Sequence, residues 1–173
     1  MRAFLLATVV MLAAACATPR RPEGAPSRVV VVGASVVSKP APRGLVGDVF
    51  GGDEPRDVVA REGAEALRSR GYEVVAAESL PGPAPTVEQS AALARQYKAD
   101  AAVVLVLTKL DLSALQPLGQ AEVGLEWMMV GPDGRVLSTE ERRGATSENL
   151  YRARTDWRSH VRQAVVQAVR ELP

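Results

Sequence analysis

The sequence predicts a single α/β domain with the element order β-α-β-α-β-β-β-α and a mixed five-stranded sheet packed with helices in two or three layers. Three observations predict it. In the first half, apolar runs of strand length alternate with amphipathic segments of helical period. Two strands joined by a tight turn follow, and the last segment has the most regular helical periodicity of the chain. Crossovers between parallel strands are right-handed, and the most apolar strands, the first and the third, are expected in the centre of the sheet. Together these favour the sheet order 2-1-3-4-5.

The first strand is expected over residues 28–37, where a continuous β-branched run suits a strand buried on both faces. A helix is expected to begin at residues 53–55, because acidic side chains favour the positive end of the helix dipole and proline fits the first turn. Gly71 is predicted to end this helix as a left-handed cap. The second strand is expected over residues 72–77.

Thr86 and Gln89 have the spacing of a capping box, which predicts the start of a second helix. Residues 101–107 form the most apolar stretch after the amino-terminal segment, as expected of a central strand.

The next two strands are predicted over residues 121–129, where apolar and polar side chains alternate, and over residues 135–142. The Gly-Pro-Asp-Gly sequence at 131–134 favours the turn between them. A final helix is predicted over residues 157–172. Its apolar face consists of Trp157, Val161, Ala164, Val165, Ala168 and Leu172.

The amino-terminal segment reads MRAFLLATVVMLAAAC, with one positive charge before an apolar run and then small residues. This pattern is typical of an export signal, and the run is shorter than the ~20 residues that a membrane-spanning helix needs. Small residues directly before Cys16 resemble the bacterial lipobox, in which the cysteine takes a diacylglycerol thioether and its new amine is acylated after cleavage. Ala13 occupies the position where the lipobox usually has leucine, and Leu12 lies one residue earlier.

The predicted organisation is therefore a signal peptide at 1–15, a lipidated Cys16 with a proline-rich tether at 16–27, and a periplasmic domain at 28–173. Fully extended, the eleven tether residues after the cysteine span at most about 35–40 Å. Ala17 is not aspartate, which by the sorting habit of enteric bacteria favours the outer membrane. The alternative is ordinary cleavage at Ala15, which would leave a free cysteine, or at Ala17.

Composition limits the chemistry. The chain has 173 residues with 21 Lys and Arg against 20 Asp and Glu, and loss of Arg2 with the signal leaves it neutral. Nucleic-acid binding driven by overall charge is therefore not expected. One histidine and one cysteine are too few for a protein-built metal site or a thiol dyad, so no metal and no cofactor are expected. The stretch of four valines before Gly33 resembles the opening of a dinucleotide-binding strand, but no glycine-rich nucleotide fingerprint continues from it.

Two surfaces are candidates for partner binding. The loop GLVGDVFGG places apolar side chains where polar residues are usual, and the alternative is that they cover the sheet locally. These candidate residues are Leu45, Val46, Val49 and Phe50. A basic surface would meet phospholipid head groups or an acidic partner, although such a run is often a solvated helix face. Its residues are Arg152, Arg154, Arg158 and Arg162.

Two further groups have simpler explanations. His160 has the side chain suited to general-base chemistry near neutral pH, and a surface or boundary position on the last helix is the expected alternative. The acidic residues at 53, 54 and 57 would bind a cation or, more simply, favour the helix start.

The layout from 28 to 172 resembles a group of small periplasmic lipoproteins. The matching stretches are a helix ending in LRSRGYEVV, a helix leading to KADAAVVLVL, and the hairpin GPDGRVLSTEERRG before a last helix. This group shares the fold of the curli-secretion lipoprotein, of the lipoprotein activators of penicillin-binding proteins and of the amino-terminal domain of the Tol-system propeller protein. The resemblance implies a non-enzymatic role in envelope assembly, secretion or regulation of a membrane machine. The chain lacks the long hairpins from which the curli pore builds its barrel.

We therefore expect a non-enzymatic outer-membrane lipoprotein that acts as a binding or assembly accessory of a cell-envelope complex. Its expected partners are the membrane, through the lipid, and an envelope protein, with self-association left open. The alternatives are a subunit of an oligomeric secretion channel and a periplasmic hydrolase whose cleft contains His160.

Overall fold

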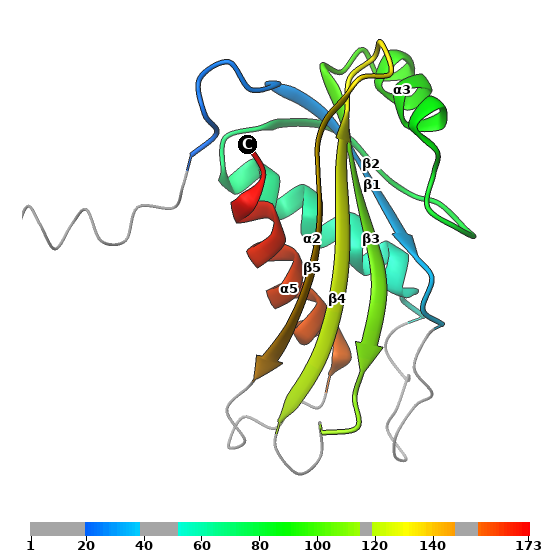
Figure 1. The fold of residues 1–173 in the computed structure, drawn as a ribbon, viewed down its shortest axis with the longest axis vertical. Helices are drawn as coiled ribbons and strands as arrows, with labels where there is room; N and C mark the ends of the chain where they lie inside the picture. Colours follow the sequence, from blue (N-terminus) through cyan, green and yellow to red (C-terminus); the bar gives the residue numbers. More distant parts are fainter. Residues whose placement is uncertain (1–19, 39–51, 115–118, 148–155) are drawn as a thin grey trace, which may run out of the picture.

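The computed structural model describes residues 20–38, 52–114, 119–147 and 156–173, and it confirms the predicted element order (Figure 1). The elements are β1 (Arg28–Ser35), α2 (Pro55–Ser69), β2 (Glu73–Ser79), α3 (Val87–Gln96), β3 (Ala101–Asp111), β4 (Gln120–Val130), β5 (Val136–Ser147) and α5 (Trp157–Glu171).

The five strands form one mixed sheet in the predicted order β2-β1-β3-β4-β5. Strands β2, β1 and β3 are parallel, whereas β3, β4 and β5 are antiparallel neighbours. The step from β1 to β2 and the step from β2 to β3 run in opposite directions across the sheet. Right-handed crossovers therefore require α2 and α3 to lie on opposite faces, which is where they are found.

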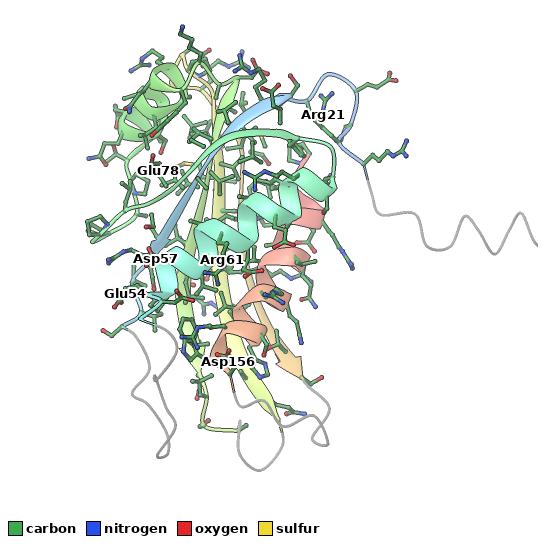
Figure 2. The ribbon with its side chains drawn as sticks, turned by 180° about the vertical axis from the view of Figure 1, so that it is seen from behind. Arg21, Glu54, Asp57, Arg61, Glu78 and Asp156 are labelled. Carbon is green, nitrogen blue, oxygen red and sulfur yellow. The ribbon has the colours of Figure 1, made fainter. Side chains whose placement is uncertain are left out.

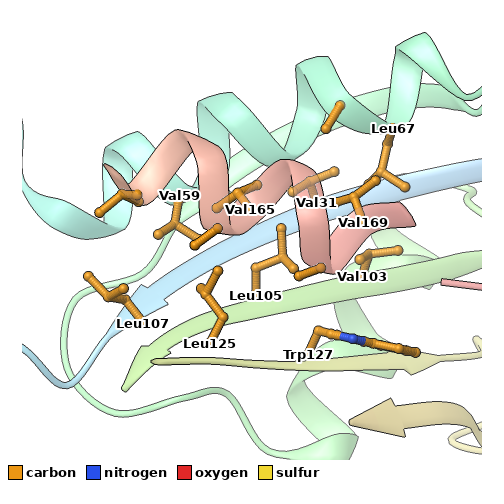
Figure 3. Packing of buried hydrophobic residues seen from close by; sticks show 14 of the residues in the cluster. Val31, Val59, Leu67, Val103, Leu105, Leu107, Leu125, Trp127, Val165 and Val169 are labelled. Carbon is orange, nitrogen blue, oxygen red and sulfur yellow. The ribbon is translucent and has the colours of Figure 1, made fainter. Parts of the chain in front are cut away.

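The main core lies between the sheet and the helices α2 and α5, which cover the same face (Figure 3). Val31 of β1, Leu105 of β3 and Leu125 of β4 point into this layer and are at most 1% exposed. They meet Val59 of α2 and Val165 of α5. Each such side chain contributes about 1.5–3 kcal/mol by its removal from water, so this layer holds most of the stabilising burial.

The opposite face is covered by α3 at one end of the sheet. Val30 and Ala102 are neighbours in register and pack with Ala94 of α3. A second small cluster continues along this face and consists of Val32, Ala34, Val104 and Val106. The molecule therefore has three layers, with the thicker helical layer on the α2 and α5 side.

The strands begin where the sequence predicted to within one residue, but their ends differ: β2 ends at Ser79 rather than 77 and β3 at Asp111 rather than 107. Strand β1 ends at Ser35 rather than at 37, because the Ser35 hydroxyl donates to the carbonyl of Val37 at 2.8 Å and accepts from its N–H at 3.1 Å. Such a side-chain turn competes with strand pairing. Strand β5 extends to Ser147 rather than 142, because its backbone stays paired with β4 as far as Gln120.

Gly33 and Gly63 are the places where α2 approaches the sheet most closely. A Cβ on Gly33 would lie 2.4 Å from the carbonyl oxygen of Arg56, whereas a Cβ on Gly63 would lie 2.4 Å from the end of the Leu105 side chain. The backbone of α2 has no freedom to yield, but a leucine methyl group does. Gly33, within the first strand, therefore serves helix packing.

We expect Gly33→Ala to lower the free energy of unfolding by about 1–3 kcal/mol through overpacking. Gly63→Ala is the matched control and should cost less, because Leu105 can change rotamer. Urea denaturation of both variants measures the difference. Equal losses, or a larger loss for Gly63→Ala, would contradict this account of the α2 contact.

Candidate functional site

The two ends of the sheet carry different groups of connections (Figure 1). At one end, Arg28 pairs with Glu73 and Val130 pairs with Val136. At the other end lie the end of β3, the start of β4 and the end of β5, as the pairing of Gln120 with Ser147 shows.

Within the described residues, no helix is long and apolar enough to cross a membrane.

Several predicted site residues lie outside the described residues. These are Cys16, the apolar loop residues Leu45, Val46, Val49 and Phe50, and the basic residues Arg152 and Arg154. The described residues that flank the two internal segments belong to the sheet end opposite Arg21, the end that also carries Asp156 (Figure 2). These flanking residues therefore lie far from Arg21.

Residues 20–27 contact the domain, whereas the sequence predicted an extended tether over the whole of 17–27. The N–H of Arg21 donates to the carbonyl of Arg70 at 3.0 Å, and the N–H of Ala25 donates to the carbonyl of Pro22 at 3.3 Å. The Asp100 carboxylate accepts the backbone N–H of Ser27 at 3.0 Å and that of Arg28 at 2.9 Å. The segment is therefore fixed at both of its ends.

This contact shortens the distance over which a lipid on Cys16 would hold the domain. From Cys16 to Arg21, the first fixed backbone group, the chain advances five residues. Five residues span at most about 18 Å, roughly half the reach of the extended tether. An anchored domain would therefore lie close to the leaflet that carries its lipid.

Asp100 holds the start of β1, and the backbone N–H of Arg28 is the main cause of the lowered pKa of its carboxyl. The Ser27 hydroxyl and N–H lower this pKa further. Because the folded-state pKa lies below the ordinary value of 3.8, the contact stabilises the folded chain above that pH. Its contribution is lost as the pH falls through the lowered pKa.

We expect Asp100→Asn to speed hydrogen exchange in residues 20–28 several-fold at neutral pH, because a neutral amide is a weaker acceptor than a carboxylate. Exchange in β3 should not change. Asp133→Asn, at another exposed turn, is the matched control. Unchanged protection of Ser27 and Arg28 in Asp100→Asn would show that the carboxylate does not hold the segment.

Arg70 links this segment to the end of α5 and was not singled out from the sequence. Its side chain is 4% exposed, and its Nη1 donates to the carbonyl of Leu172 at 2.9 Å and also to that of Val169. Its guanidinium lies 5.7 Å from the ring centre of Tyr72, a cation–π distance. Arg70 therefore binds the carbonyl end of α5, through Val169 in its last turn and through Leu172, which follows it.

The described part of the predicted basic surface is engaged in ion pairs. Arg162 binds Glu62 of α2, with Nε 2.7 Å from Oε2, and this hydrogen bond is the main cause of the raised pKa of Arg162. Arg158 pairs with Asp53 at 3.4 Å and with Asp156 at 3.1 Å. These two arginines therefore join α5 to α2, and a role toward phospholipid or an acidic partner stays a prediction.

The acidic cluster at the start of α2 has structural partners. Asp57 accepts the backbone N–H of Glu54 at 3.4 Å, as a capping interaction, and Asp53 pairs with Arg61 at 3.4 Å. Among the described residues, no three His, Cys, Asp or Glu side chains lie close enough together to hold a metal ion.

His160 is fully buried, so the expectation of a surface or boundary histidine was wrong. Its Nδ1 lies 2.7 Å from the hydroxyl oxygen of Thr146, and that hydroxyl donates to the carbonyl of Ala121 at 3.2 Å. The arrangement assigns the ring proton to Nδ1. The imidazole bridges α5 to β5 in the core, where it does not meet a substrate from solvent.

A groove of about 260 Å³ lies between α2 and the edge strand β2. Three alanines and three charged residues line it, and Figure 2 shows two of the charged ones, Asp57 and Arg61, on α2. No sequence signal marked this groove, because its two sides are separated by a turn and come together through the crossover. Its lining residues are Asp57, Ala60, Arg61, Ala64, Arg68, Ala77 and Ser79.

Comparison with known proteins gives no family. No family model matches the chain, and no curated protein matches it. Among solved structures, the lipoprotein GNA1162 from Neisseria meningitidis is similar, with 15% sequence identity, a TM-score of 0.43, and coverage of 84% of this chain and 98% of that chain. A second structure, described only as an uncharacterized protein, has 10% identity, a TM-score of 0.40, and coverage of 83% and 88%.

Proposed function

We propose that this chain is an outer-membrane lipoprotein, anchored through Cys16 and facing the periplasm, that acts as a non-enzymatic accessory of a cell-envelope complex. The amino-terminal pattern and the chain's single cysteine at its end support the anchor. The observation that carries the proposal is the docking of residues 20–27 on the domain through Arg70 and Asp100. Anchored in this way, the domain stays within a short distance of its leaflet.

The short reach supports a partner in or beside the membrane that holds the lipid. With at most about 18 Å between the lipid-bearing residue and the first fixed backbone group, the domain does not cross the periplasm to the inner membrane. Its partner is therefore expected in or beside the same membrane.

Lengthening the tether tests this proposal. We expect a flexible Gly-Ser insert of about 30 residues after Thr18 to lower partner crosslinking in intact cells roughly tenfold, because effective concentration falls steeply with tether length. The matched control is an insert of the same composition in the 131–134 turn, which leaves the tether unchanged. Undiminished crosslinking would contradict the proposal, as would direct crosslinking of the unmodified domain to an inner-membrane protein.

A further inference from the structure

We propose that two copies of this chain associate through the edge strand β2, paired antiparallel about a two-fold axis perpendicular to the sheet. The two sheets would become one, and the α2 helices of the two copies would lie beside each other on the same face. Four features of the described residues support this arrangement: an open backbone edge, a groove beside it, alanines that line the groove and a self-complementary pattern of charge. The inference does not depend on the lipid anchor.

The β2 edge has backbone groups available for pairing. Leu80 donates its N–H to the carbonyl of Gly33 at 3.0 Å. The register of β2 with β1 shifts by one residue at Val75 and is regular from Ala76 to Ser79. Because N–H groups alternate between the two sides of a regular strand, the N–H of Ala77, three residues before Leu80, points away from β1. Ala77 is exposed. An edge of this kind is a template for pairing with another strand.

The other edge of the sheet is different. Strand β5 carries exposed charged side chains in its middle, at residues 140, 141 and 143. The middle of β2 reads Val-Val-Ala-Ala, and its acidic residues lie at 73 and 78. Charged side chains resist pairing, and the middle of β2 carries none, so β2 is the edge better suited to an added strand.

The groove beside β2 leaves room for a second helix. Ala60 and Ala64 lie on the α2 side of it and Ala77 lies on the strand side. In an antiparallel pair of β2 strands, α2 of the partner subunit approaches from the far side of the groove. Small residues allow two helices to approach closely, so pairing of the strands would close the groove with helix contacts.

The two-fold axis would place opposite charges of the two α2 helices at the same height. The start of α2 is level with the end of β2, because Gly33 lies against Arg56 and Ala60 and is also in register with Ser79. Asp57 and Arg68 border opposite ends of the groove and are separated by eleven residues, or about 16 Å along the helix. An axis midway between them places Arg68 at the same height as Asp57 of the partner subunit.

The same axis suits the strand. The midpoint between Asp57 and Arg68 falls near Glu62 and Gly63, and β2 has its own midpoint at Ala76. Helix and strand have nearly equal lengths, about 22 Å for α2 and about 23 Å for β2, so one axis centres both. Among the described residues, Arg68 forms no ion pair within its own chain. An isologous contact of this kind closes as a dimer.

Native mass spectrometry of the full chain in detergent tests the proposal. The unmodified chain should be a dimer. Arg68→Glu should raise the dimer dissociation constant at least tenfold, because the new carboxylate would repel the carboxylate of Asp57 of the partner subunit. Arg170→Glu is the matched control, since Arg170 is an exposed arginine in the last turn of α5 as Arg68 is in the last turn of α2. It should leave the dissociation constant unchanged.

Charge exchange makes the test specific to this contact. Asp57→Lys should weaken the dimer, and the double variant Asp57→Lys with Arg68→Glu should restore it. Because Asp57 also caps α2, thermal melting of the single variants should accompany the measurement. Ala77→Pro should give a folded monomer, since proline is tolerated where an edge N–H faces solvent but removes that donor and blocks pairing.

Four results would overturn the proposal. They are a monomeric unmodified chain, a ring of more than two copies, a dimer that persists in both Arg68→Glu and Ala77→Pro, and a double variant no tighter than its parents. A thiol probe identifies the neighbour directly. Ala77→Cys in a Cys16→Ser background has one cysteine, and a short bis-maleimide should crosslink it to a second copy. Crosslinking only to a different protein would overturn the proposal as well.

Discussion

Trp157→Ala should lower the free energy of unfolding by about 3–5 kcal/mol, because it removes a large side chain from the core. Trp157 is 8% exposed and belongs to the main core cluster, although it is the first residue of α5. The guanidinium of Arg158 lies 5.3 Å from its ring centre, so the variant also loses a cation–π contact. For a domain of this size the expected fall in melting temperature is about 6–20 °C.

Gln167→Ala is the matched control for this prediction, since Gln167 lies on the exposed side of the same helix. It should change stability by at most about 0.5 kcal/mol. Calorimetry or urea denaturation of the two variants measures both values. A melting temperature unmoved by Trp157→Ala would mean that the start of α5 does not pack against the sheet.

Cys16→Ser should abolish labelling of the chain by a fatty-acid probe and leave it unprocessed or soluble. Serine has no thiol to form the diacylglycerol thioether, and the lipoprotein cleavage step acts after that modification. The expected change is complete loss rather than a graded one, because the chain has no second cysteine. Labelling and membrane fractionation of the variant measure it.

Ala13→Leu is the control, because it restores the residue usual at that position of the lipobox. It should label at least as strongly as the unmodified chain. Labelling of Cys16→Ser at the unmodified level would contradict lipidation at this residue.

The features that were predictable from the sequence depend on neighbouring residues. Thr86 and Gln89 cap each other as their spacing predicts, with Gln89 accepting the N–H of Thr86 at 2.9 Å. Gly71 follows α2 with φ +89°, the left-handed conformation expected of a glycine helix end. The sheet order was predictable from the apolar composition of β1 and β3 and from the right-handedness of crossovers.

The features that were missed depend on contacts between distant residues. Nothing in the sequence around Arg70 distinguishes it from the exposed Arg68. Arg70 is buried because the fold brings the end of α5 beside it, where its side chain binds two carbonyls. Glu62 reads as a solvated helix residue but is 4% exposed, because Arg162 lies across it. The β2 groove likewise needs the crossover to bring α2 over the edge strand. Periodicity does not carry information of this kind.

Intact-mass measurement of the mature chain, isolated from the membranes of cells that make it, tests the central claim most directly. The account predicts a chain that begins at Cys16 and carries a diacylglyceryl group on its sulfur and an acyl group on its amine. A mature chain that begins at Cys16 or at Thr18 without lipid would contradict it.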